Sequence, residues 1–319
     1  MCIKKYLIYF LIFIFFNCIF VSFLKADPTY LAVEQNEDEF DLTTGITFNN
    51  DGSKMYVVGS LGNEDRIVEY NLTTNYDVST KSVSHRLIKS GSATATNTVL
   101  ADITFRPHDI RFNNDGTRMY LPMFGGHIET YSLSTAFAIS SASLVDDTFN
   151  PSENTASSKA IEFNSTGTKV FIGDGTHIDE YNVATAFDLT STVTYVDKLE
   201  LGYSLTSMAF SDDGTVLFVL TQGDNDKSIY EYNLTTGFDL STATYADKFD
   251  VENREVRPHG IAFNSDGDKV FITGWDGQTG NDDDDEINTF SLSPKYNLGN
   301  PTLTSTSPAD NATGVSVDA

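Results

Sequence analysis

Short runs of alternating apolar and polar residues recur along most of the chain, and this period favours β-strands over helices. Clusters of Asn, Asp, Gly, Ser and Thr separate the runs about every 8 to 12 positions, at the spacing typical of turns in all-β proteins. No window keeps the 3.6-residue apolar period of an amphipathic helix. The pattern therefore predicts an all-β chain of short antiparallel strands.

One phrase occurs five times. In the copy that starts at Gly260, GIAFNSDGDKVFIT, a short apolar strand, an Asn-x-Asp-Gly turn and a β-branched second strand follow one another. A second phrase (IYEYNLTT from Ile229) and an FDLST-like turn (from Phe238) supply a third strand and lead into a fourth. The shared Phe occurs at Phe48, Phe112, Phe163, Phe210 and Phe263. One four-stranded sheet cannot bury both of its faces, so radial stacking into a five-bladed β-propeller is predicted.

The two ends of the repeat region predict how the ring closes. The fifth copy ends after FSLSPKYNLGN without a fourth strand, whereas TYLAVEQNEDEFDLTTGITF near the N-terminus aligns with ATYADKFDVENREVRPHGIAF. The latter segment contains a fourth strand and the first strand of the next copy. We therefore expect Tyr30 to Phe40 to complete the last blade as its outer strand, which would leave no open sheet edge.

The combined phrases FNxDGxKMYVVG, IxEYNLST and FDLSTATY resemble a bacterial family of secreted propeller repeats, loosely similar to YVTN-type and NHL-type propellers, over residues 27–299. The tail NPTLTSTSPADNATGVSVDA, residues 300–319, resembles the first strand of a bacterial Ig-like domain, which needs roughly 100 residues in full. The resemblance implies a bacterial surface protein with further Ig-like domains in the same chain. It also implies that the tail by itself is poorly ordered.

Residues 1–26 predict export. Lys4 and Lys5 precede a nearly unbroken apolar run from Tyr6 to Leu24, and Ala26 then precedes a polar residue. This order is typical of a secretory signal peptide. An uncleaved membrane anchor is the alternative, because 19 mostly apolar residues nearly span a bilayer. Both interpretations put the rest of the chain outside the cytoplasm, as a secreted, periplasmic or cell-surface protein.

The charge of the chain restricts its partners. Lys and Arg number 20 against 45 Asp and Glu, a formal net charge of −25. Nucleic acids and anionic lipid surfaces are bound through Lys and Arg contacts to phosphate, so the sequence predicts neither as a partner. The only cysteines, Cys2 and Cys18, lie in the N-terminal segment. The rest of the chain therefore has no thiol for a disulfide, a metal site or a nucleophile.

One repeat position, four residues before the shared Phe, is expected at the mouth of the central channel. Its occupants are Thr44, His108, Lys159, Thr206 and His259. This polar, partly cationic ring would suit an anionic or sugar ligand, or a metal held by the two imidazoles. The alternative is structural, since both histidines belong to an Arg-Pro-His phrase that could simply shape the loops between blades.

The loops between second and third strands are variable and several are acidic. The most acidic one contains Asp282, Asp283, Asp284, Asp285 and Glu286. Closely spaced carboxylates are the oxygen ligands that Ca²⁺ prefers, although none of these loops has the EF-hand spacing. A Ca²⁺ site is the functional prediction here, and a solvated loop is the alternative. Trp275, the only Trp, precedes this run and is suited to stacking on a sugar ring.

Catalytic motifs are missing: the sequence has no G-x-S-x-G, no H-E-x-x-H and no phosphate-binding Gly-rich loop. Glu129, Glu180 and Glu231 recur at one position of the repeat, in third strands, where a strand-face role is expected rather than acid–base catalysis. We therefore expect a non-enzymatic extracellular binding or adhesion module for a cell-surface polysaccharide or protein. The alternatives are a secreted, calcium-dependent hydrolase or lyase acting on a polysaccharide or lactone near His108 and His259, and a purely structural envelope protein.

Overall fold

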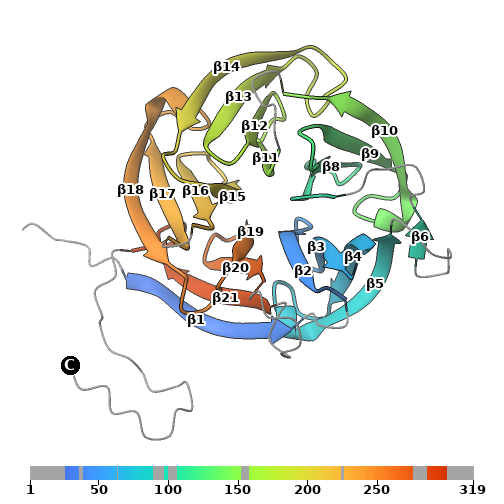
Figure 1. The fold of residues 1–319 in the computed structure, drawn as a ribbon, viewed down its shortest axis with the longest axis horizontal. Helices are drawn as coiled ribbons and strands as arrows, with labels where there is room; N and C mark the ends of the chain where they lie inside the picture. The colour runs from blue at the N-terminus through green and yellow to red at the C-terminus, as the bar shows by residue number, and fades with distance from the viewer. Residues whose placement is uncertain are drawn as a thin grey trace, which may run out of the picture.

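The computed structural model describes residues 26–35, 39–62, 64–88, 97–99, 106–151, 158–223, 226–275 and 286–299. Five sheets, each built on four antiparallel strands, surround a central channel (Figure 1), which confirms the predicted five-bladed propeller. The predicted signal or anchor segment, apart from its last residue, and the Ig-like tail lie outside the described residues. Within the described ranges, no helix is long and apolar enough to cross a membrane.

Each blade runs from an inner strand beside the channel to an outer strand at the rim (Figure 1). Blade 1 consists of β2 (Leu42–Phe48), β3 (Lys54–Leu61), β4 (Glu64–Leu72) and β5 (Lys81–Ile88). Blade 2 consists of β7 (Arg111–Phe112), β8 (Arg118–Pro122), β9 (Ile128–Leu133) and β10 (Ala142–Phe149). Blade 3 consists of β11 (Ala160–Phe163), β12 (Lys169–Gly173), β13 (His177–Val183) and β14 (Val193–Glu200). Blade 4 consists of β15 (Leu205–Phe210), β16 (Val216–Thr221), β17 (Ser228–Leu234) and β18 (Ala243–Asp250).

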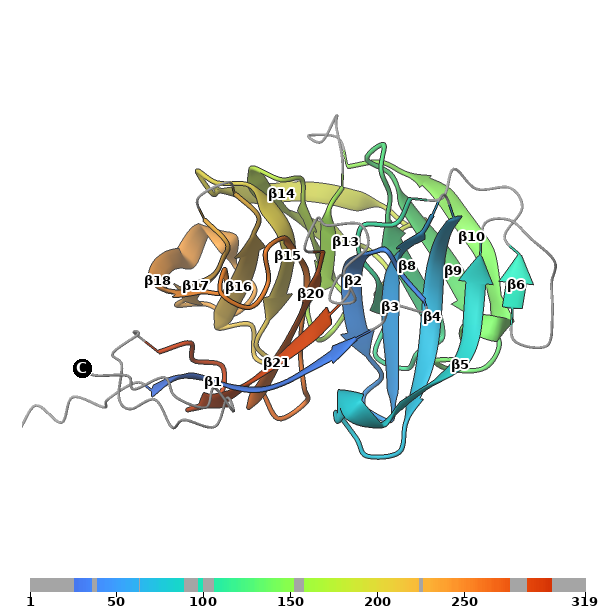
Figure 2. The ribbon, with the colours of Figure 1, turned by 60° about the horizontal axis from the view of Figure 1, so that its bottom comes forward.

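Blade 5 combines both ends of the repeat region. It consists of β19 (Pro258–Phe263), β20 (Lys269–Gly274), β21 (Glu286–Ser293) and β1 (Ala26–Gln35). β1 lies antiparallel along β21 (Figure 2), so the predicted closure by the N-terminal strand is confirmed. The strand covers Ala26–Gln35 rather than the predicted Tyr30–Phe40. Phe40 lies past its end and is buried between blades 5 and 1, in one cluster with Ile46 and Phe271.

The Asn-x-Asp-Gly phrase forms the turn between first and second strands, as predicted. Gly214 has a φ of +70°, and a Cβ there would lie 2.2 Å from the ring of Phe238. The glycine is therefore required both by its backbone conformation and by the ring packed on it. The same ring position is occupied in every blade, always with a φ between 49° and 58°, by Tyr76, Phe137, Phe187, Phe238 and Tyr296.

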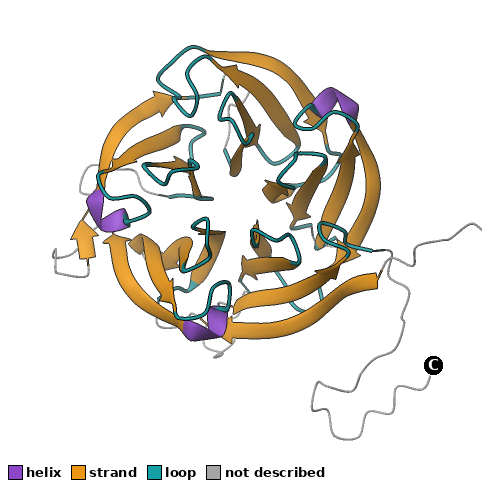
Figure 3. Cartoon of the chain, turned by 180° about the vertical axis from the view of Figure 1, so that it is seen from behind, coloured by secondary structure: helices purple, strands orange, loops and turns teal. Residues whose placement is uncertain are grey.

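The FDLST-like phrase forms a single 3₁₀ turn between third and fourth strands. Asp239 caps this turn in blade 4, because its carboxylate accepts a hydrogen bond from the backbone N–H of Ser241 at 3.1 Å. The three turns of this kind lie near the rim (Figure 3) and are η1 (Val78–Thr80), η2 (Ile139–Ser141) and η3 (Leu240–Thr242).

The hydrophobic core lies between the blades, in five clusters that correspond to the five blade interfaces. At each interface the shared Phe of one blade packs against an aromatic residue of the preceding blade, with ring centroids 4.5–4.7 Å apart. Such pairs add about 0.5–1.5 kcal/mol each beyond the burial of their area. The ring closes because the pair Phe271–Phe48 repeats this contact between blades 5 and 1.

A glutamate in the third strand ties successive blades together. Glu180 of blade 3 accepts a hydrogen bond from the backbone N–H of Leu240 in blade 4 at 3.0 Å, and Lys169 pairs with it at 2.6 Å. Glu69 and Glu231 accept the equivalent backbone hydrogen bond from the next blade. The strand-face role expected of these glutamates is therefore an interface contact.

The predicted grouping of Glu129 with this set is wrong. Tyr120 pairs with Thr130, as Phe171 pairs with Glu180, so Thr130 occupies the equivalent position. Glu129 is one residue earlier and points to the opposite face of the strand, where it accepts a hydrogen bond from the Tyr131 hydroxyl at 2.7 Å.

Closure of the ring does not remove every sheet edge, because each blade still ends in an outer strand. In all five blades the pairing register between the third strand and the outer strand is shifted by a bulge. In blade 3 this shift lies between Glu180 and Tyr181. Such bulges twist an edge and oppose pairing with other sheets. In blade 1 a short strand, β6 (Asn97–Val99), also pairs in parallel with the outer strand.

Candidate functional site

The central channel is blocked midway by Arg111 of β7. Its Nε donates to Glu162 of blade 3 at 2.7 Å, and its Nη1 donates to Asp109 at 2.8 Å. Its other hydrogen bonds, of 2.7–3.3 Å, reach the backbone carbonyls of Ile46, Ile110, Met208 and Ile261. These partners belong to all five blades. Inner strands present unpaired carbonyls to the channel, and Arg111 satisfies them.

The inner strands of neighbouring blades approach one another closely beside Asp109. A Cβ on Gly45 would lie 2.7 Å from the Cα of Asp109, and one on Gly260 would lie 2.9 Å from the Cα of Gly45. Both glycines are therefore needed for the close approach of the inner strands. Burial raises the pKa of Asp109 to about 7, although the guanidinium of Arg111 opposes this shift.

Two of the five predicted mouth residues, Thr44 and Thr206, bond to the loop of the next blade, and Thr44 also lines a cavity at this mouth. The Thr44 hydroxyl of blade 1 donates to the carbonyl of Pro107 in blade 2 at 2.9 Å. The Thr206 hydroxyl of blade 4 donates in the same way to Pro258 in blade 5 at 3.1 Å. Both contacts join the inner strand of one blade to the Pro-His phrase of the next.

The other three predicted residues come together at the loop-side mouth, where the inner strands begin. Burial is the main cause that lowers the pKa of both His108 and His259 to about 4, and the nearby charge of Lys159 contributes to both shifts. Burial also lowers the pKa of Lys159. Both imidazoles are therefore neutral at pH 7. Within the described part of the chain, no three His, Cys, Asp or Glu side chains are grouped to hold a metal ion.

Two arginine–aromatic pairs flank these residues. The guanidinium of Arg106 lies 5.6 Å from the ring centroid of Phe124, and that of Arg257 lies 4.3 Å from Trp275. In each pair the aromatic residue also donates its backbone N–H to the arginine carbonyl, at 2.9 and 3.1 Å. Blades 2 and 5 thus build the same unit from Arg-Pro-His and an aromatic residue. A cavity of about 320 Å³ lies on the blade 1 side of the first unit, and its lining includes Thr44, Asp65, Arg106, His108 and Phe124.

Sequence reasoning found Trp275 but missed Phe124, its counterpart. Both aromatic residues stand twelve positions after the shared Phe of their repeat, Phe263 and Phe112. That equal spacing, together with the two Arg-Pro-His phrases, was a signal that could have paired them.

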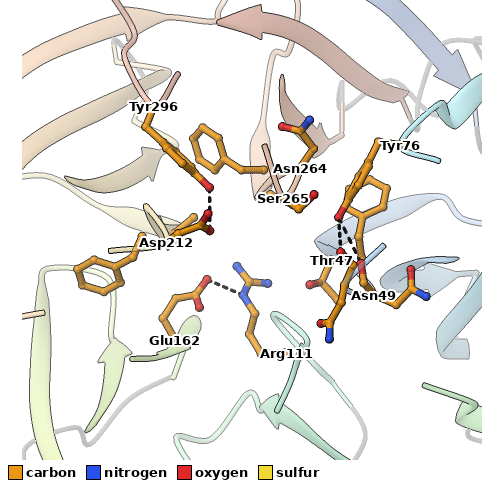
Figure 4. Close-up of a pocket in the computed structure, with 15 residues that line it drawn as sticks. Thr47, Asn49, Tyr76, Arg111, Glu162, Asp212, Asn264, Ser265 and Tyr296 are labelled. Carbon is orange, nitrogen blue, oxygen red and sulfur yellow. Dashed lines mark hydrogen bonds and ion pairs between the residues drawn. The ribbon is translucent and has the colours of Figure 1, made fainter. Parts of the chain in front are cut away.

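A second cavity opens on the other side of Arg111, where the Asn-x-Asp-Gly turns meet (Figure 4). It measures about 440 Å³, and Arg111 and Glu162 are among the residues that line it. Tyr76 and Tyr296 lie on opposite sides of it in Figure 4, and Asp212 accepts a hydrogen bond from the Tyr296 hydroxyl at 2.9 Å. No repeat position singled out in the sequence predicted this cavity. The available signal was Arg111 and Glu162, opposite charges at one position of adjacent repeats.

The predicted Ca²⁺ site is mostly outside the described residues. Asp282, Asp283, Asp284 and Asp285 are not described, and Glu286 is the first residue of β21, opposite Gln35. The Ca²⁺ site therefore stays a prediction.

No protein-family model and no curated protein matches the sequence. Among solved structures, a candidate 6-phosphogluconolactonase from Bacteroides uniformis aligns with 12% identity and a TM-score of 0.45, over 80% of this chain and 68% of its own. A functionally unknown protein from Desulfotomaculum acetoxidans aligns with 14% identity and a TM-score of 0.49, over 82% of this chain and 87% of its own. Similarity at this level carries no argument about the site or the activity.

Proposed function

We propose that the protein is a non-catalytic binding module that holds an anionic carbohydrate at the loop-side mouth of its channel. The observation that carries this proposal is the repeated unit of arginine and aromatic residue beside Lys159. A sugar carboxylate would pair with Arg106, Arg257 or Lys159, while Phe124 or Trp275 packs against the apolar face of a sugar ring. The extracellular location and a role in adhesion remain predictions from the N-terminal segment and the Ig-like tail.

The acidic surface of the chain does not prevent such binding. The net charge of −25 repels anions over long distances, but salt screens exposed charges beyond about 8–10 Å. Inside that distance the ligand would meet Lys159, Arg106 and Arg257. A hydrogen bond to a charged group contributes about 1.5–3 kcal/mol, so the local contacts outweigh the screened repulsion.

The two imidazoles favour binding over catalysis. With a pKa of about 4, His108 and His259 are weak bases at neutral pH, which makes them poor general bases for a hydrolase or lyase. Neutral imidazoles serve well as hydrogen-bonding partners of sugar hydroxyls. The Nδ1 of His259 is buried and has no hydrogen-bond partner among the described residues.

Calorimetric titration of the purified protein with oligogalacturonate and with its neutral methyl ester tests the proposal. We expect the acid to bind at least 10-fold more tightly than the ester, and Lys159→Met to weaken binding about 10-fold, which corresponds to about 1.4 kcal/mol. Lys198→Met is the matched control, because Lys198 lies on the outer strand of blade 3 and pairs with Glu200. Trp275, the only Trp, provides an independent fluorescence signal. Equal binding of acid and ester, or no effect of Lys159→Met, would refute the assignment.

A further inference from the structure

We infer that the cavity on the turn side of Arg111 is a second binding site, which takes a small organic cation and recognises its protonated amine. This inference does not depend on the proposed function, because it concerns the opposite mouth of the channel. The volume of about 440 Å³ is within the usual range for small-molecule sites. Its chemistry follows from the hydrogen bonds that the lining residues already make.

Most hydrogen-bond donors of the lining are already engaged. Arg111 directs its five N–H groups to backbone carbonyls, Asp109 and Glu162. The hydroxyl of Tyr76 donates to the backbone carbonyl of Asn50 at 3.0 Å, and the amide of Asn50 donates to Asn114 at 2.7 Å. An anionic ligand would therefore have to displace bonds that hold the blades together.

Acceptors, in contrast, remain available. Glu162 receives Arg111 on Oε1, and Asp212 receives Tyr296 on Oδ1. Among the described residues no side chain donates to the second oxygen of Asp212, whereas Glu162 also accepts a hydrogen bond from the backbone N–H of Phe163. A ligand that fills this cavity must therefore bring N–H or O–H donors of its own.

The charges favour a cation over a neutral donor. Glu162 and Arg111 form an ion pair and neutralise each other. Asp212 has no ion-pair partner among the described residues, so its charge is uncompensated at the cavity. Aromatic rings complete the lining, including Phe48, Phe210 and Phe263. Carboxylates combined with aromatic rings are the surroundings that protein sites offer to ammonium groups.

The two mouths of the channel therefore differ in charge. Lys159 and the two arginine–aromatic pairs lie on the loop side, whereas Asp212 and Glu162 lie on the turn side. Arg111 separates the two sides. The structure thus predicts opposite ligand preferences for the two ends of one channel.

Calorimetry with glucosamine and glucose tests this inference, since the two sugars differ by the ammonium group. We expect glucosamine to bind at least 10-fold more tightly than glucose, and Asp212→Asn to weaken glucosamine binding about 10-fold. The amide introduced by this substitution can still accept from the Tyr296 hydroxyl, so an unchanged melting temperature will show that the fold is intact. Asp266→Asn is the matched control, because Asp266 is an exposed residue of a neighbouring turn outside the cavity lining.

The outcomes separate the two sites. Lys159→Met, which disables the loop-side mouth, should leave glucosamine binding unchanged. Equal affinity for glucosamine and glucose would overturn the inference in favour of a site for neutral hydroxyl groups. Undiminished glucosamine binding by Asp212→Asn would show that the amine binds elsewhere.

Discussion

Replacing Arg111 by Met tests whether one side chain closes the ring at its centre. Methionine retains much of the length of arginine and its apolar stem but has no N–H donor. The substitution removes every hydrogen bond from the side chain at position 111 to the carbonyls of Ile46, Ile110, Met208 and Ile261. It also leaves the carboxylates of Asp109 and Glu162 without their cation.

The expected loss of stability is about 3–5 kcal/mol at pH 8, the usual cost of removing one partner from a buried ion pair. For a domain of this size, that corresponds to a fall in melting temperature of about 6–20 °C. Water that enters from the turn-side cavity can satisfy part of the orphaned carbonyls. The free energy lost by leaving these carbonyls without a donor is therefore only partly added to the loss from the broken ion pair.

The loss should depend on pH through Asp109. Its pKa of about 7 exceeds the usual 3.8, so the folded protein binds more protons than the unfolded chain between these values. Stability from this group therefore falls as pH rises through that window. Without Arg111 the pKa rises further, which extends the loss above pH 7. The substitution should consequently destabilise less at pH 5, where Asp109 is protonated in both proteins, than at pH 8.

Urea unfolding of the wild type and Arg111→Met at both pH values measures these differences from the transition midpoints. Asp109→Asn added to Arg111→Met should recover part of the loss at pH 8, because it removes the unpaired charge. A loss below about 1 kcal/mol, or an equal loss at both pH values, would refute the view that Arg111 neutralises the centre of the ring.

Two further predictions concern the repeat. Gly214→Ala should destabilise the protein far more than Gly202→Ala, because both have positive φ but only Gly214 has a ring where the Cβ would lie; similar melting temperatures would contradict this explanation. Glu180→Ala should lower the free energy of unfolding by about 1–3 kcal/mol, because the buried N–H of Leu240 would lose its hydrogen-bond acceptor. Glu200→Ala, in a fully exposed residue, should leave the urea midpoint nearly unchanged, and equal effects of the two would argue against the interface role.

The architecture could be predicted because the sequence pattern of the same strands occurs in all five repeats. Each pattern alone is weak evidence for a strand, but the five copies support one another. The strand exchange followed from the same comparison, although Phe40 was assigned to the strand when it belongs to an interface. The error over Glu129 had a local cause. Glu129 precedes Thr130, the residue in register with the glutamates of the other blades, and a one-residue offset changes the face of a strand.

The site was predictable only in part. The position four residues before the shared Phe does lie at the mouth, and His108, Lys159 and His259 do come together there. The use of Thr44 and Thr206 as supports of the next blade could not be read from spacing, since their acceptors are backbone carbonyls. The role of Arg111 could not be predicted for the same reason. Most of its partners are backbone carbonyls of other blades, and the sequence pattern does not show which carbonyls face a given side chain.

The exchange of β1 into blade 5 has a consequence for the order of folding. Strands of the other four blades pair with neighbours close in sequence, so these sheets can form from local hairpins. The contact between Ala26 and Ser293 instead closes a loop of nearly the whole domain. Contacts of such long separation form slowly, because the entropy of loop closure must be overcome first. The ring should therefore close last, and until then blade 5 presents β21 as a bare edge.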